Sequence, residues 1–388
     1  MTVEMKKYRL ADIAEIVISS VDKKTKSGEK IVRLCNFTDV YHNWAIKQSD
    51  YDSFMVASAS DSNINKLSLK KGFVAFTKDS ETRDDIGIST YIADDFDDVV
   101  LGYHCALAKP NEKIVYGKYL NAFMSSDYIK KYFELNATGS GMRFTLAVST
   151  MEDMPIMLPS LNVQKKIGDM LSDFDKRIEN LRAQNRVLEQ TAKTIYDYTF
   201  LQCAGHQTTY NKTLNRNIPA DWEVKKLGDL LTIKNGKDHK HLKEGSFAVY
   251  GSGGLMRKVD SFLYDGESVL IPRKGTLNNV MYVDEKFWTV DTMFYTVMNE
   301  PYYGKYIYYS VRDIDFMARN SGTGVPSMTS GYLNTISIML PDAQILENFN
   351  NQVTPLFKKV QLNTKQIEAL TTQRNSLLPL LMTGQINI

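Results

Sequence analysis

An internal repeat constrains the fold of this 388-residue chain more than any other feature of its sequence. Four short strings occur twice, in the same order. They are LADI at 10–13 and LGDL at 227–230, YGKYL at 116–120 and YGKYI at 303–307, GSG at 139–141 and GTG at 322–324, and IMLP at 156–159 and 338–341. One such match could arise by chance, but four in the same order predict two related modules in one chain.

Each IMLP string is followed by apolar residues whose spacing alternates between four and three, the pattern of a coiled-coil seam. The predicted seam residues are Ile167, Leu171, Phe174, Ile178, Leu181, Asn185 and Leu188 in the first run, and Phe349, Val353, Leu356, Val360, Asn363, Ile367 and Leu370 in the second. Adding 182 to each member of the first run gives the second. An ordinary amphipathic core helix is the alternative, but two long runs in register favour two long helices, which we expect to pair antiparallel.

An asparagine interrupts each of the two apolar runs, and two prolines lie within the second run. Asn185 and Asn363 lie in the seams, where buried amides can fix the register of a coiled coil. Pro355 lies early in the second run and predicts a late start or a kink, and Pro379 predicts a break near its end.

The repeat and the helical runs divide the chain into five segments. They are a first module at 1–160, a long helix at 161–203, a polar linker at 204–221, a second module at 222–342 and a second long helix at 343–388. Short apolar runs bounded by turn residues predict strands at 73–76, 99–101, 268–271 and 280–283, and short helices are expected within 119–135 and 306–319. We therefore predict an α+β fold with an internal repeat.

Composition narrows the class of protein. The formal net charge is only +2, from 47 basic and 45 acidic side chains, so nucleic-acid binding would depend on local patches. The three cysteines form no closely spaced pair, so neither a disulfide framework nor a zinc site is expected. No stretch approaches the roughly 20 apolar residues of a membrane span, and residues 1–13 do not resemble a signal peptide. A cytoplasmic protein without a membrane partner is predicted.

Three basic loops of the second module, at 234–241, 250–257 and 272–279, and the glycine string at 321–327 gather residues suited to DNA. They combine Arg and Asn, which can pair with base edges, with Lys and His for phosphates and Gly for close approach. The candidate DNA-binding residues there are Lys237, His239, Lys240, His241, Tyr250, Ser252, Arg257, Arg273, Lys274, Thr276, Asn278, Thr323 and Ser327. A solvated surface turn is the more common explanation of any one of these loops, but three of them in one small module favour DNA. The glycine string at 321–327 could equally be a structural turn.

The first module offers fewer candidates. They are Lys23, Lys24, Lys26, Lys78, Arg83 and Arg143. An acidic segment at 94–98 also lies in this module, so its basic character is weaker.

The chain lacks the motifs of the relevant enzymes. Neither glycine string is followed by the Lys and Ser or Thr of a P-loop, and neither has the context of a dinucleotide-binding fingerprint. We find no motif for methylating a flipped base, no nuclease signature and no His spacing for a metal. We therefore predict no catalytic residue, no metal site and no cofactor on this chain.

Two related modules separated by long helices would be held at a fixed distance from each other. DNA-binding dimers place their half-sites about one helical turn apart, roughly 34–36 Å. One chain with two different modules would read two different half-sites separated by unread bases.

These features resemble the specificity (S) subunits of type I restriction-modification systems, over essentially the whole chain. The most similar strings are WEVKKLGD at 222–229, YGSGG at 250–254, RKG at 273–275, TVDTMFY at 289–295 and LLPLLMTGQI at 377–386. In the first module TKD at 77–79 stands roughly where the second has RKG. The resemblance therefore indicates the DNA contacts of the first module less directly than those of the second.

The resemblance implies two target-recognition domains that each read half of a gapped, bipartite DNA site, with helices that set the gap and dock partners. The implied partners are double-stranded DNA, two methylation (M) subunits and up to two restriction (R) subunits. S-adenosylmethionine, ATP and Mg²⁺ would then belong to the partner subunits.

Two alternatives remain at this point. A self-contained DNA methyltransferase or nuclease would bind S-adenosylmethionine or metal by itself. A structural coiled-coil or regulatory DNA-binding protein would bind DNA without any M subunit.

Overall fold

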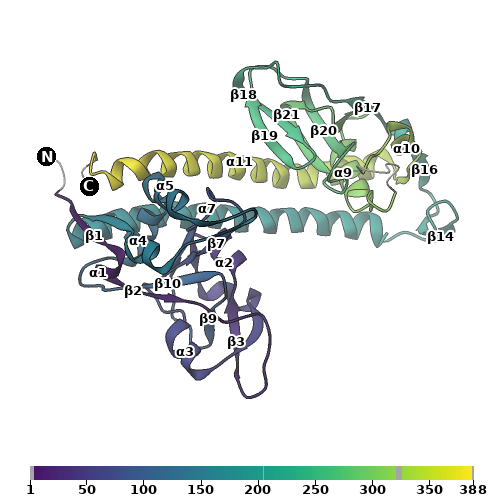
Figure 1. The fold of residues 1–388 in the computed structure, drawn as a ribbon. Coiled ribbons are helices and arrows are strands. Elements are labelled where there is room, and N and C mark those ends of the chain that lie inside the picture. The colour runs from purple at the N-terminus through teal and green to yellow at the C-terminus, as the bar shows by residue number, and fades with distance from the viewer. Residues whose placement is uncertain (1–3, 204, 320–325, 387–388) are drawn as a thin grey trace. The chain divides into compact units, whose positions relative to one another are not determined.

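The computed structural model describes residues 4–203, 205–319 and 326–386, which form two compact units (Figure 1). Unit 1 comprises Met1–Arg182 and Thr364–Ile388, and unit 2 comprises Ala183–Asn363. Each unit therefore contains one module and one segment of each long helix, α7 (Leu161–Tyr196) and α11 (Ala343–Met382).

The first module in unit 1 is built on a five-stranded sheet and a three-stranded sheet. Its strands are β1 (Lys6–Arg9), β2 (Ala14–Ile18), β3 (Lys30–Cys35), β4 (Ala45–Ile46), β5 (Met55–Ala59), β6 (Val74–Thr77), β7 (Asp79–Ser80), β8 (Ser89–Ile92), β9 (Val99–Leu101), β10 (Cys105–Pro110), β11 (Thr138–Ser140), β12 (Arg143–Thr145) and β13 (Pro155–Leu158). Its helices are α1 (Leu10–Ile13), α2 (Phe37–His42), the 3₁₀ helix η1 (Gln48–Ser53), α3 (Asp61–Leu67), α4 (Gly117–Met124), α5 (Asp127–Asn136) and α6 (Val148–Glu152). The larger sheet has the order β2-β10-β6-β8-β4, and β5-β3-β9 form a second sheet.

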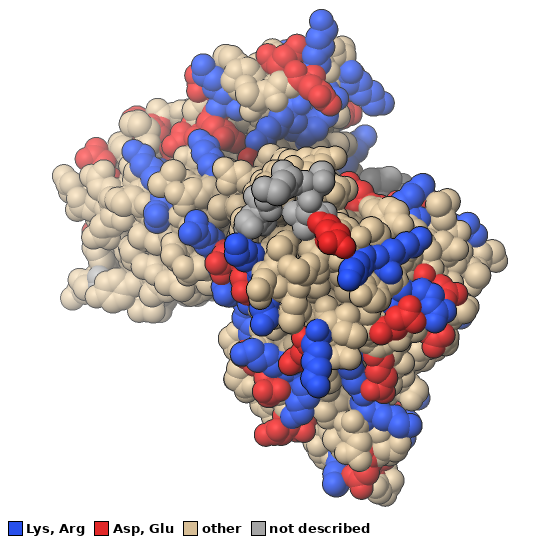
Figure 2. Space-filling view, turned by 90° about the vertical axis from the view of Figure 1, so that its left-hand side faces the viewer, with Lys and Arg blue, Asp and Glu red and all other residues tan. Residues whose placement is uncertain are grey.

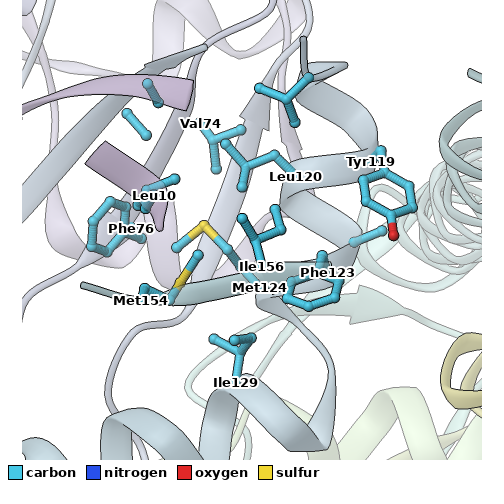
Figure 3. Packing of buried hydrophobic residues seen from close by; sticks show 14 of the residues in the cluster. Leu10, Val74, Phe76, Tyr119, Leu120, Phe123, Met124, Ile129, Met154 and Ile156 are labelled. Carbon is cyan, nitrogen blue, oxygen red and sulfur yellow. The ribbon is translucent and has the colours of Figure 1, made fainter. Parts of the chain in front are cut away.

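The main core of unit 1 lies between the larger sheet and helices α1 and α4. Leu10, Val74, Phe76 and Leu120 from these elements converge in Figure 3 and are fully buried. Burial of each such side chain stabilises the fold by about 1.5–3 kcal/mol. Leu171 of α7 and Leu381 of α11 join the same core, so both long helices are anchored in unit 1 by apolar packing.

The second module in unit 2 is built on one larger sheet with the order β17-β22-β20-β21-β18-β19. Its strands are β14 (Thr208–Asn211), β15 (Arg216–Pro219), β16 (Glu223–Lys226), β17 (Leu231–Asn235), β18 (Glu244–Gly251), β19 (Gly254–Val259), β20 (Tyr264–Pro272), β21 (Met281–Thr289), β22 (Met293–Met298) and β23 (Ser337–Leu340). Its helices are the π-helical turn η2 (Asp197–Leu201), α8 (Leu227–Leu230), α9 (Tyr303–Arg312) and α10 (Ser330–Asn334). The core of unit 2 receives Tyr196 of α7 and Phe349 of α11.

The predicted strands and short helices are confirmed in both modules, and the internal repeat extends to single hydrogen bonds. In unit 1, β1 pairs antiparallel with β13, and in unit 2, β16 pairs antiparallel with β23. The hydroxyl of Tyr119 donates to the carbonyl of Met157 at 2.8 Å, and that of Tyr306 donates to the carbonyl of Met339. The predicted α+β fold with an internal repeat is therefore correct.

We predict that Tyr119→Phe and Tyr306→Phe each lower the free energy of unfolding by about 1–2 kcal/mol, because each leaves a buried carbonyl without its donor. The measurement is denaturant unfolding of the full chain, with Tyr128→Phe as the control because Tyr128 is 56% exposed. Equal losses in the control and in the two variants would contradict the structural role of these hydroxyls.

The two long helices run antiparallel within each unit. In unit 2 the side-chain amide of Asn363 donates to Oδ1 of Asn185 at 2.9 Å, while Tyr196 and Phe349 meet nearer the other end of the unit. In unit 1 the guanidinium of Arg374 donates to Asp175. All fourteen predicted seam residues are buried or half-buried.

Helix α11 continues through both of its prolines, so the predicted late start and break are wrong. It spans Ala343–Met382 and contains Pro355 and Pro379. A proline removes only one backbone donor. Val353 and Leu356, on either side of Pro355, pack against the core of unit 2, and this packing outweighs the lost hydrogen bond.

Within the predicted linker, the described residues 205–221 contain regular secondary structure. Strands β14 and β15 form a hairpin, in which Asn211 Oδ1 accepts hydrogen bonds from the backbone N–H groups of Thr213 and Leu214. Ile218 is buried in the core of unit 2. The composition of the segment did not indicate this hairpin, because few of its residues are large and apolar. Among the described residues, no helix is long and apolar enough to cross a membrane.

Candidate nucleic-acid interface

The three predicted basic loops of the second module meet at one turn, Thr289–Thr292, between β21 and β22. The backbone N–H of Lys237 donates to the Thr289 carbonyl at 2.9 Å, and that of Arg273 donates to the Thr292 carbonyl at 2.8 Å. The N–H of Val290 donates to the carbonyl of Tyr250 at 3.0 Å. We call this turn the hub of module 2, because it joins loops that are far apart in the sequence.

Side-chain hydrogen bonds and a close backbone contact also hold the basic loops near the hub of module 2. The indole N–H of Trp288 donates to the carbonyl of Lys237 at 2.9 Å, and the side-chain amide of Asn279 donates to the carbonyl of Ser252 at 2.8 Å. A Cβ at Gly236 would lie 2.0 Å from the carbonyl oxygen of Val290, so only glycine allows this close approach of the loop to the hub.

Three of the predicted DNA-binding residues form the framework of these loops. Arg257 donates to the carbonyls of His239 and Leu242 at 3.0 and 2.7 Å. The side-chain amide of Asn278 donates to Asp315 at 3.1 Å and accepts from the backbone of Met317 at 3.0 Å. The hydroxyl of Tyr250 donates to Glu285 at 2.7 Å. Each of these three side chains therefore holds a loop in place through hydrogen bonds within the module.

The remaining candidates of module 2 differ in their exposure. Lys237, Lys240, His241, Lys274 and Thr276 are exposed, whereas His239, Ser252, Arg273 and Ser327 are half-buried. The guanidinium of Arg273 lies 5.9 Å from the ring centroid of Phe294, and Ser327 forms a β-bridge with Lys274. Thr323 lies outside the described residues.

The first module has an equivalent hub at Leu101–Cys105, between β9 and β10. The backbone N–H of Ser19 donates to the Cys105 carbonyl at 3.0 Å, and that of Lys78 donates to the His104 carbonyl at 2.9 Å. The N–H of Tyr103 in turn donates to the carbonyl of Val21 at 2.8 Å.

This geometry corrects the alignment of the two modules by one residue. Lys78 occupies the position of Arg273, and Asp79 that of Lys274, because each pair makes the same contacts: Lys78 and Arg273 donate to their hubs, while Asp79 and Lys274 pair with Thr145 and Ser327. The sequence comparison had placed Thr77 opposite Arg273, since only strand pairing reveals the register.

Carboxylates neutralise much of the charge near the hub of module 1. Asp79 accepts from Lys78 Nζ at 3.0 Å and lies 2.7 Å from Nδ1 of His104. Burial alone would raise the pKa of the Asp79 carboxyl, but hydrogen bonds from Thr145, His104 and Lys78 outweigh it and lower this pKa below its ordinary value. Asp79 therefore stays ionised and binds both the Lys78 ammonium and the His104 imidazole.

The other predicted residues of module 1 lie on loops or, in the case of Arg143, at the start of a strand. The Arg83 guanidinium lies 5.3 Å from the ring centroid of Phe144 on β12, and Arg143 begins the same strand. Lys23, Lys24 and Lys26 lie between β2 and β3, where Lys26 pairs with Asp22 at 3.4 Å. In Figure 2, Lys and Arg are interspersed with Asp and Glu, so no large surface of one sign is visible on that face.

Sequence reasoning did not find the two hubs, nor Tyr103, His104 and Asp79 in module 1. The string at 289–295 indicated only a family resemblance, and the segment at 101–105 in module 1 has no similar sequence. The described residues contain no group of three or more His, Cys, Asp or Glu side chains that could hold a metal ion.

Comparison with known proteins decides the family. A sequence model described as the type I restriction modification DNA specificity domain matches residues 2–190 and 219–372. The chain belongs to this family of type I restriction-modification specificity subunits. The two matched segments correspond to the two copies of the internal repeat.

Individual relatives agree with this assignment. The chain is 28% identical over 311 residues to the type I restriction enzyme MjaIX specificity subunit of Methanocaldococcus jannaschii, which covers 72% of this chain and 71% of the relative. It is 19% identical over 406 residues to the HindI specificity subunit of Haemophilus influenzae, covering 83% and 88%. The crystal structure of a type I S subunit from M. genitalium has the same fold, with a TM-score of 0.64 at 16% identity over 98% of this chain and 96% of that one.

The relatives are specificity subunits, which are the non-catalytic subunits of these systems. The prediction of a non-catalytic specificity subunit with two recognition domains is therefore confirmed. The family assignment favours this prediction over the two alternatives, a self-contained enzyme and a structural or regulatory DNA-binding protein.

Proposed function

We propose that each module of this specificity subunit reads one half of a gapped, bipartite site in double-stranded DNA. The observation that carries this proposal is the equivalence of the hubs: in each module one turn joins loops from distant parts of the sequence, and cationic side chains stand on those loops. Loops on a rigid scaffold are typical positions for recognition residues. Lysines would contact phosphates, and the half-buried Arg273 would contact base edges.

The long helices would set the gap between the half-sites and dock two M subunits. Helix α7 has 36 residues and is about 54 Å long at 1.5 Å per residue. Val187 of α7 and Leu362 of α11 are 66% and 50% exposed, and a docked M subunit would cover apolar side chains of this kind. Up to two R subunits would join the assembly.

The chemistry would belong to the partners. The M subunits would bind S-adenosylmethionine and methylate adenine, and the R subunits would use ATP and Mg²⁺ to translocate and cleave. The assembly would act in the cytoplasm, where its DNA substrate is.

The test is a methylation map. The chain is expressed with its cognate methylation subunit in a host, and the host DNA is sequenced for methyladenine. We expect one gapped, two-part motif that disappears when this chain is omitted. A map that is the same with and without this chain would refute the proposal.

A single substitution in module 2 should affect only one half of that motif. Lys274 is exposed and forms no ion pair with any described residue, so Lys274→Ala removes a free cation from a hub loop. We expect methylation to spread to variants of one half-site or to fall there by roughly tenfold, with the other half and the gap unchanged.

The matched control is Lys286→Ala, because Lys286 of the same module is paired with Asp265 at 3.8 Å. Relaxation of both half-sites by Lys274→Ala would show that the two modules do not read DNA independently.

A further inference from the structure

The hub of module 1 carries two exposed side chains that no sequence motif indicated, Tyr103 and His104. Tyr103 is 48% exposed and the His104 side chain 50% exposed, although the neighbouring Leu101 and Cys105 are fully buried. Two aromatic rings therefore stand at the surface on a turn whose two ends are fixed in the core.

His104 has a left-handed backbone conformation, which is unusual for a residue other than glycine. Its φ is +73°, one of only three positive φ values among the non-glycine residues that the structure describes. This left-handed region is costly for a residue with a Cβ, and strained residues of this kind gather at functional sites. The conformation is held in place, because the carbonyl of His104 accepts from Lys78 and the N–H of Tyr103 donates to Val21.

The orientation of the imidazole is also fixed. Its Nδ1 lies 2.7 Å from Oδ2 of Asp79, which in turn accepts from Lys78 Nζ at 3.0 Å. The rings of Tyr103 and His104 lie with their centroids 4.0 Å apart, and Lys78 Nζ is 5.9 Å from the Tyr103 centroid. With Nδ1 committed to Asp79, the ring's remaining polar atom is Nε2.

Resting on the proposed function, we propose that Tyr103 and His104 read base edges in the half-site of module 1, with Lys78 and Asp79 as positioning residues. A fixed aromatic pair offers hydrogen-bonding atoms, Nε2 and the hydroxyl, at little cost in side-chain entropy. Lys274 of module 2 forms no ion pair with a described residue, whereas Lys78 of module 1 is paired with Asp79. Module 1 would therefore recognise bases mainly through its aromatic pair, and module 2 through its cationic side chains.

The test compares substitutions that separate the imidazole from the backbone. His104→Gly removes the imidazole and permits the positive φ, and His104→Asn keeps a short polar side chain that tolerates the left-handed region. Tyr103→Phe removes only the hydroxyl. Each variant is mapped for methyladenine as the full chain with its cognate methylation subunit, and Tyr128→Phe on exposed α5 is the control.

We expect His104→Gly and Tyr103→Phe to relax one or two base positions in the half-site that Lys274→Ala leaves unchanged, by on the order of tenfold in the preference for the correct base. A structural role would instead lower methylation equally at all sites without changing the motif. That outcome, or a motif unchanged in every variant, would overturn the inference.

Failure of the proposed function would look different, because wild-type chain would then yield no gapped motif. If His104→Gly does not assemble with the methylation subunit, His104→Asn and Tyr103→Phe decide the question. His104→Asn tolerates the left-handed backbone, and Tyr103→Phe keeps the pair of rings. A motif unchanged in these two would also overturn the inference.

Discussion

Arg374→Ala should destabilise unit 1 by about 3–5 kcal/mol, because it removes the partner of a buried carboxylate. Arg374 of α11 donates to Asp175 of α7, and the Asp175 side chain is only 11% exposed. Burial raises the pKa of Asp175 to about 6 despite the opposing charge of Arg374. Without the guanidinium, the carboxylate would have to be protonated or remain as an unpaired buried charge.

The measurement is denaturant unfolding of the full chain near pH 7, followed for the transition of unit 1. Lys176→Ala is the control, since Lys176 is one residue further along α7 and forms an exposed ion pair with Asp173 at 3.1 Å, worth less than about 1 kcal/mol. Adding Asp175→Asn to Arg374→Ala should restore much of the loss, because the neutral amide needs no counter-charge. A loss in Arg374→Ala no larger than in the control would contradict the role assigned to this pair.

The same pair predicts a pH dependence with a definite sign. The folded state binds the proton of Asp175 more tightly than the unfolded chain, whose pKa is near 3.8. Stability from this group is therefore fully present below pH 4 and is lost as the pH rises through about 6. At 1.36 kcal/mol per unit, the difference amounts to about 3 kcal/mol. Asp175→Asn should remove this part of the slope between pH 4 and 7.

Removing three lysines from the hub loops of module 2 should weaken DNA binding on the order of 10²-fold at about 0.1 M salt. The variant combines Lys237→Ala, Lys240→Ala and Lys274→Ala, all exposed on loops that meet at Thr289–Thr292. Each lysine that contacts a phosphate releases condensed counterions, so the slope of log affinity against log salt should fall by about 2.7.

The control removes the same charge from lysines of unit 2 that are already paired. Lys225 lies 2.7 Å from Glu223, Lys286 lies 3.8 Å from Asp265, and Lys193 lies 2.7 Å from Asp197. The triple alanine control should change the slope by less than about one, since those cations are less available to phosphates. Binding is measured by titration of the complete methyltransferase complex on duplex DNA from about 0.05 to 0.3 M salt. An equal effect of both triple variants would mean that net charge, and not the hub loops, governs affinity.

The sequence alone predicted the long helices and the repeat because both depend on local spacing. The alternation of four and three along α7 and α11 is a property of a single helix, and the offset of 182 can be read without knowing any contact. The start of α11 at Ala343, 182 residues after the start of α7 at Leu161, follows the same offset.

Local rules failed where distant packing decided the outcome. Pro355 would end an isolated helix, but α11 is held by Val353 and Leu356 in the core of unit 2. The hairpin β14–β15 depends on Ile218, which reaches the same core. Neither effect can be read from composition, because the stabilising contacts come from residues far along the chain.

The sequence by itself determined the family, the two modules and the general location of the basic loops. Only the tertiary structure decided which polar side chains are engaged in hydrogen bonds within the modules. Arg257, Asn278 and Tyr250 were candidate DNA-binding residues, yet their side chains form hydrogen bonds with residues 15 to 39 positions away in the sequence. Tyr103 and His104 looked unremarkable until strand pairing placed them on a hub. The physical reason is that a side chain's availability depends on its neighbours in space, and in these modules most of them are brought together by long-range strand pairing.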